Sequence, residues 1–106
     1  MKLIIAIVHD EDSGRLTERF SKEKVQFTKL ASTGGFLRSG NVTLMIGTEP
    51  KNVDDIIEII KDVCKSRTEL VAPAASNFFT SMNWPYEVNV GGATVFVLDI
   101  DRYEKI

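Results

Sequence analysis

The segment TKLASTGGFLRSGN, residues 28–41, combines residue types that suit a small, anionic, aromatic ligand. Its Gly34-Gly35 pair allows backbone N–H groups to converge on an anion and lets a ligand approach without meeting a Cβ atom. Phe36 offers a face on which a base could stack, Leu37 an apolar wall, and the Asn41 amide both a donor and an acceptor for a base edge. The same residues also suit a hairpin turn with Phe36 in an oligomer contact. Spacing alone leaves both interpretations open.

Other candidate motifs have simpler explanations. His9-Asp-Glu-Asp12 places an imidazole beside carboxylates, but consecutive residues at a strand-to-helix junction rarely point at one ion. Capping of a helix by Asp10 or Asp12 is the favoured role. The glycine pair Gly91-Gly92 falls inside a predicted strand, where it indicates a bend, a bulge or a close approach of another chain. With one histidine and no nucleophile or metal motif, the sequence predicts neither a catalytic nor a metal site.

Length and composition restrict the class of protein. A chain of 106 residues with 43% apolar and 26% charged residues fits one globular domain spanning 1–106. The net charge of −2 argues against binding of a nucleic-acid polymer. The single cysteine, Cys64, cannot form an internal disulfide, and no segment approaches a membrane-spanning length. We therefore expect a cytoplasmic protein that does not act at a membrane.

Hydrophobic periodicity predicts the elements that position the loop. Leu16 and Phe20 lie one turn apart on the inner side of a first helix, and the sequence TEP at 48–50 opens a second, with Val53, Ile56, Ile57, Ile60 and Cys64 on its apolar side. Strands are expected at 3–8, 25–32, 42–47, 69–72 and 86–100, with a loop at 73–85. The first strand is expected to be buried on both faces.

This order is β-α-β-β-α-β plus a further strand, an α+β, ferredoxin-like arrangement. Helices cover only one face of such a sheet. The other face also carries apolar residues, so we expect self-association to hide it from water.

Two long segments, TKLASTGGFLRSGN at 28–41 and EVNVGGATVFV at 87–97, resemble the cyclic di-AMP receptors of the PII-like signalling superfamily. The resemblance extends over nearly the whole chain. It implies a PII-like subunit that forms a homotrimer, binds cyclic di-AMP in the clefts between subunits, and performs no catalysis. It further implies that ligand binding orders the long loop and so signals to a downstream protein, whose identity the sequence does not reveal. No cofactor other than this ligand is implied.

The resemblance also implies which residues line the cleft. Thr28 and Asn41 would hydrogen-bond the ligand, and backbone near Gly35 would hold it. Gln26 stands where the family commonly has an arginine, and Lys24 or Lys29 could supply the missing charge. The full set of expected ligand-binding residues is Gln26, Thr28, Lys29, Gly35, Phe36, Leu37, Asn41, Gly47 and Phe96.

Two alternatives remain open in the sequence. The departure at Gln26 could favour another adenine nucleotide, such as ATP or AMP. Alternatively, the chain could be a protein-interaction module whose loops grip a partner while the cleft is vestigial.

Overall fold

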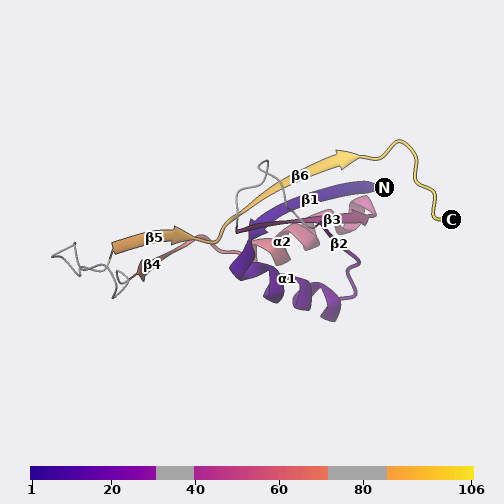
Figure 1. Cartoon of the computed structure of the whole chain (residues 1–106). Coiled ribbons are helices and arrows are strands. Elements are labelled where there is room, and N and C mark those ends of the chain that lie inside the picture. The colour runs from indigo at the N-terminus through magenta and orange to yellow at the C-terminus, as the bar shows by residue number, and fades with distance from the viewer. Residues whose placement is uncertain (31–39, 72–85) are drawn as a thin grey trace.

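The computed structural model describes residues 1–30, 40–71 and 86–106. Four strands form one antiparallel sheet in the order β2-β3-β1-β6, and two helices, α1 and α2, cover one of its faces (Figure 1). Strands β4 and β5 pair with each other in a separate two-stranded sheet. The chain is thus an α+β protein, and its strand order is consistent with a ferredoxin-like arrangement.

Strand β1, Lys2–His9, is the centre of the larger sheet, paired with β3, Asn41–Thr48, and with β6, Ala93–Asp99. Its even-numbered residues from Ile4 to Val8 are buried under the helices, whereas the alternate residues are only half-buried. The expectation that this strand is buried on both faces is therefore wrong for the single chain, because no element among the described residues covers the second face. We call that second face the open face.

Helix α1 spans Asp10–Lys22 and packs Leu16 and Phe20 into the core, as predicted. The predicted cap is wrong, since His9 is the N-cap residue and no side-chain hydrogen bond caps this end. Acidic residues do fill the first turn, where they complement the helix dipole. One of them, Asp12, is buried and interacts with arginines instead of capping the helix.

A 3-10 turn at Pro50–Asn52 leads into helix α2, Val53–Val63, so the predicted start at the proline is confirmed. Ile56 and Ile60 are buried, as is Cys64 just beyond the helix. Ile59 is also buried, although periodicity did not single it out, because the helix face toward the sheet is wider than a single stripe.

The predicted strands at 25–32 and 86–100 differ from the structure. Strand β2 covers only Thr28–Leu30 among the described residues. The long strand is divided into β5, Tyr86–Val90, and β6 by Gly91 and Gly92, whose φ angles are +81° and +80°. Such left-handed conformations favour glycine and break the extended run, which confirms the bend expected from the glycine pair.

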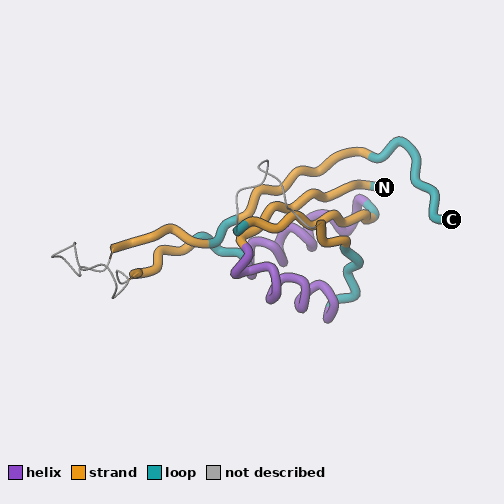
Figure 2. The backbone as a smooth tube through the Cα atoms, viewed as in Figure 1, coloured by secondary structure: helices purple, strands orange, loops and turns teal. Residues whose placement is uncertain are grey.

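Strand β4, Arg67–Val71, pairs with β5 to form a hairpin that projects from the body of the protein (Figures 1 and 2). The molecule consequently measures 59 × 28 × 20 Å, with a radius of gyration of 17.4 Å. A closed globule of this length would have a radius of gyration of about 13 Å. None of the helices in the described ranges is long and apolar enough to cross a membrane.

Candidate functional site

Strand register gathers four of the expected ligand-binding residues on the open face. Residues that lie directly opposite each other in an antiparallel pair share a face, and faces alternate along a strand. Thr28 pairs with Met45, Met45 with Ile5, and Ile5 with Phe96, which makes one transverse row across the sheet. Asn41 and Gly47 lie an even number of residues from Met45 on β3 and therefore share this face.

Lys29 lies on the other face of the sheet. Its Cα is paired with Leu44, which is fully buried beneath the helices. The Lys29 side chain is exposed but leaves the strand on the side opposite to Thr28. The structure of the single chain therefore does not bring Lys29 together with Thr28.

A hollow of about 530 Å³ lies beside β2 and the far end of β3. Its lining includes Gln26, Thr28 and Gly47 from the expected set. The sequence did not single out Met45 and Tyr103, which also line this hollow. Among the described residues, a Cβ atom at Gly47 would meet only Met1 Cε, at 3.6 Å, so none of them requires a glycine there. We call this cavity the open-face hollow.

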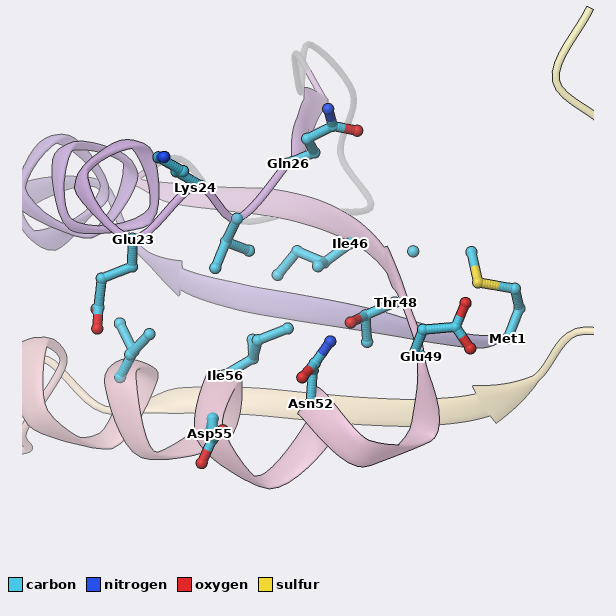
Figure 3. Close-up of a pocket in the computed structure, with 13 residues that line it drawn as sticks. Met1, Glu23, Lys24, Gln26, Ile46, Thr48, Glu49, Asn52, Asp55 and Ile56 are labelled. Carbon is cyan, nitrogen blue, oxygen red and sulfur yellow. The ribbon is translucent and has the colours of Figure 1, made fainter.

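A second hollow, of about 480 Å³, adjoins the first and shares Met1, Val25, Gln26 and Gly47 with it. It lies between the end of α1, the end of β3 and the start of α2 (Figure 3). Figure 3 shows polar side chains on both sides of it, including Lys24 and Gln26 on one side. We call this cavity the helix-side hollow.

Lys24 supplies a cation to the lining of the helix-side hollow. Its φ angle is +59°, a left-handed conformation that is uncommon for a residue with a side chain. The Lys24 N–H donates to the Ser21 carbonyl oxygen at 3.2 Å, which closes the turn after α1 and directs the chain toward Gln26. The conformation of this turn therefore sets where the Lys24 ammonium and the Gln26 amide lie.

The expected residues are not all adjacent within one chain. Asn41 and Gly47 stand at opposite ends of β3, and six residues of strand correspond to about 20 Å. Thr28 and Phe96 are separated by three strand spacings, or about 14 Å. Gly35, Phe36 and Leu37 lie outside the described residues.

An ion-pair cluster at the start of α1 was missed by sequence reasoning. Asp12 is fully buried, and its Oδ1 accepts hydrogen bonds from Arg15 at 2.6 Å and from Arg67 at 3.1 Å. Burial alone would raise the pKa of Asp12, but the two guanidinium groups lower it below its ordinary value. Arg67 opens β4, so this cluster ties α1 to the base of the projecting hairpin. No local pattern marks such a pair, whose members are far apart in the chain.

Within 1–30, 40–71 and 86–106, no group of three or more His, Cys, Asp or Glu side chains could hold a metal ion. The described site offers an open sheet face and two adjoining hollows. The Gln26 amide lines both hollows, the Thr28 hydroxyl lines the open-face hollow, and the Lys24 ammonium group lines the helix-side hollow together with three carboxylates. This set can bind a ligand that has both polar edges and flat apolar surfaces.

The fold is that of a small α+β protein with an exposed apolar sheet face and two hollows beside it. The chain matches the family model described as cyclic-di-AMP receptor over residues 1–106, and it belongs to that family. The resemblance seen in the sequence is thereby confirmed. Among solved structures, the chain is similar to the crystal structure of a functionally unknown protein from Pediococcus pentosaceus ATCC 25745. The two are 45% identical with a TM-score of 0.79, and the match covers 99% of this chain and 96% of that chain.

Proposed function

We propose that this protein is a cytoplasmic signal receptor that binds cyclic di-AMP in clefts between the subunits of a homotrimer. Membership of the cyclic-di-AMP receptor family supports the ligand. The observation that carries the proposal is the shared face of Thr28, Asn41, Gly47 and Phe96. No chemical reaction is part of the proposed role.

The spacing of these residues supports a site built from more than one chain. A ligand held by Thr28 and Gly47 in one subunit is about 14 Å from that subunit's own Phe96, three strand spacings away. Asn41, at the other end of β3, is about 20 Å from Gly47. A neighbouring subunit that packs against the open face can bring its own Asn41 or Phe96 to the same ligand.

The apolar character of the open face supports self-association. Phe96 and Leu98 are 51% and 44% exposed in the single chain, which is unusual for such large apolar side chains. Half-buried apolar residues continue the surface across the sheet. Together the apolar side chains of this face are Leu3, Ile5, Ile7, Leu30, Met45, Phe96 and Leu98. A contiguous patch of this kind is a typical protein interface.

Signalling would follow from the place of the loop in the chain. Thr28 and Asn41 lie on either side of residues 31–39, and both are on the open face. A ligand that contacts Thr28 of one subunit and Asn41 of its neighbour therefore restrains one end of this segment in each of two subunits. We propose that cyclic di-AMP acts by ordering this loop, which changes the surface offered to a partner protein.

Isothermal titration calorimetry with cyclic di-AMP tests the ligand, with cyclic di-GMP, ATP and AMP as controls. We expect saturation near one ligand per subunit. Thr28→Ala should weaken binding by roughly 3- to 10-fold, as expected for the loss of one hydrogen bond. Lys29→Ala is the matched control, because it alters the neighbouring residue on the opposite face. Equal losses in the two variants would contradict the assigned face.

The open-face interface has its own matched pair of variants. Leu98 and Val97 are adjacent on β6 and almost equally exposed, at 44% and 43%, but they point to opposite faces of the sheet. Leu98→Glu should shift the mass measured by light scattering from trimer to monomer, whereas Val97→Glu should leave it unchanged. A trimer that survives Leu98→Glu would place the interface elsewhere.

Two alternative functions each have an observation in their favour. The Gln26 side chain lines both hollows. Its amide offers a donor and an acceptor to the edge of an adenine but, unlike arginine, it has no guanidinium group to pair with a phosphate. Heat from ATP or AMP but not from cyclic di-AMP would favour a receptor for those nucleotides. The projecting β4–β5 hairpin suits contact with a protein, so the absence of binding by every nucleotide would favour an interaction module.

A further inference from the structure

The C-terminal tail begins beside the N-terminus. Strand β6 ends at Asp99, where the side chain pairs with Lys2. The next residue, Ile100, donates its backbone N–H to the Met1 carbonyl oxygen at 3.2 Å. The start of the tail and the N-terminus therefore lie together at the end of the sheet where Met1 and Gly47 line both hollows (Figure 1).

From this anchor the tail places one aromatic side chain at the open-face hollow. Tyr103 lines it together with Gln26 and Thr28 and remains 56% exposed. Phe27 also lines the hollow, but its ring packs against the core ring of Phe20, with centroids 5.9 Å apart. Tyr103 is thus the aromatic ring at this hollow whose surface is largely available to a ligand.

We propose that Tyr103 is a ligand-binding residue that stacks on a purine base held in the open-face hollow. This inference rests on the proposed nucleotide-binding function. It assigns separate tasks to the lining: Gln26 and Thr28 meet the polar edge of the base, and the Tyr103 ring covers its flat face. Gly47 also lines this hollow and has no side chain to fill it.

Stacking predicts a defined dependence on the side chain at this position. A phenyl ring stacks as well as a phenol, whereas a methyl group cannot stack. Substitution of a stacking aromatic residue by alanine removes the base–aromatic contact and lowers the affinity for the ligand by roughly 5- to 150-fold. Tyr103→Ala should therefore weaken cyclic di-AMP binding by such a factor, and Tyr103→Phe should stay within about 3-fold of the unaltered protein.

A matched control lies next in the tail. Glu104 accepts a hydrogen bond from Arg102 at 2.8 Å, so Glu104→Ala removes the tail's own ion pair but keeps the ring. We expect the affinity of Glu104→Ala to match that of the unaltered protein. Light scattering on each variant should show the same mass, which separates loss of stacking from loss of assembly.

A fluorescence experiment reports on the ring directly. Trp84 is the only tryptophan, so the double variant Trp84→Phe/Tyr103→Trp carries a single indole in the tail. Cyclic di-AMP should quench its emission, with a midpoint equal to the dissociation constant from calorimetry. An unchanged emission at saturating ligand would overturn the proposal.

The calorimetric outcomes distinguish this inference from the function on which it rests. If the unaltered protein binds no nucleotide, both the proposed function and the stacking role are refuted. If the unaltered protein binds and Tyr103→Ala binds equally well, the function stands and the stacking role is refuted. A loss in Tyr103→Phe as large as in Tyr103→Ala would also refute stacking, because the hydroxyl would then carry the interaction.

Discussion

Replacement of Gly91 by alanine should displace the base of the projecting β4–β5 hairpin and destabilise the protein. A Cβ atom at this position would lie 2.4 Å from the Lys65 carbonyl oxygen and 2.8 Å from a guanidinium nitrogen of Arg67. The first of these neighbours is backbone and cannot rotate away. The substitution therefore has to displace the segment that leads into β4, where the hairpin joins α2.

The expected loss of stability has two parts. The left-handed backbone, with φ of +81°, costs about 1–2 kcal/mol once a side chain is added. The overlap with the Lys65 carbonyl oxygen adds about 1–3 kcal/mol, the range for overpacked sites. Gly91→Ala should thus lower the free energy of unfolding by about 2–5 kcal/mol.

Gly92→Ala is the control for the backbone term. Its φ of +80° is nearly the same, but its Cβ atom would meet only the Ser66 Cβ, at 3.8 Å, which is an ordinary contact. Urea unfolding followed by far-ultraviolet circular dichroism should give a loss of about 1–2 kcal/mol for this variant. Equal losses in the two variants would refute the role of close packing at Gly91.

Three further predictions follow from other parts of the structure. Arg67 and Arg15 lower the pKa of Asp12 despite its burial. The ionised carboxylate therefore stabilises the folded protein at pH values above the ordinary pKa of 3.8, and this stabilisation is lost as the pH falls through the lower pKa of the folded state. Asp12→Asn should reduce stability at pH 7 by about 1.5–3 kcal/mol and flatten the acid side of the thermal-melting profile; an unchanged profile would contradict this. Burial, together with the Asp12 charge, raises the pKa of Cys64 to about 11, so iodoacetamide should modify this thiol at pH 8 only after unfolding in urea, as mass spectrometry would show. Asn41→Ala should weaken cyclic di-AMP binding in calorimetry without changing the mass measured by light scattering, and intact binding would remove this residue from the site.

The type of each main element was predictable because local periodicity carries that information. The continuous apolar run of β1, the alternating apolar residues of β3, and the i, i+3, i+4 pattern around Ile56 and Ile60 are each contained within one element. The bend at Gly91 and Gly92 was equally local, since it depends on the backbone freedom of glycine. The family resemblance was also present in contiguous segments, and the family match confirmed it.

Local sequence was insufficient where a residue's role depends on partners far along the chain. Asp12 has the sequence context of a helix cap, but Arg67, 55 residues later, holds it in a buried ion pair. Lys29 and Thr28 are adjacent in sequence and both polar, but pairing with β3 sends their side chains to opposite faces. A one-residue change of register would exchange the two faces, and that register depends on which face of the strand pair is buried and on the connecting turn, so residues 28 and 29 alone do not set it.

The sequence by itself determined the type of the main elements, the apolar faces of the helices and the family to which the chain belongs. Tertiary structure decided which strands are neighbours, which of the candidate residues share the open face, and where the tail places Tyr103. The physical reason is that hydrogen-bonded pairing between strands fixes side-chain direction jointly for residues as distant as Thr28 and Phe96. Such pairing is a property of the assembled sheet, and no single segment contains it.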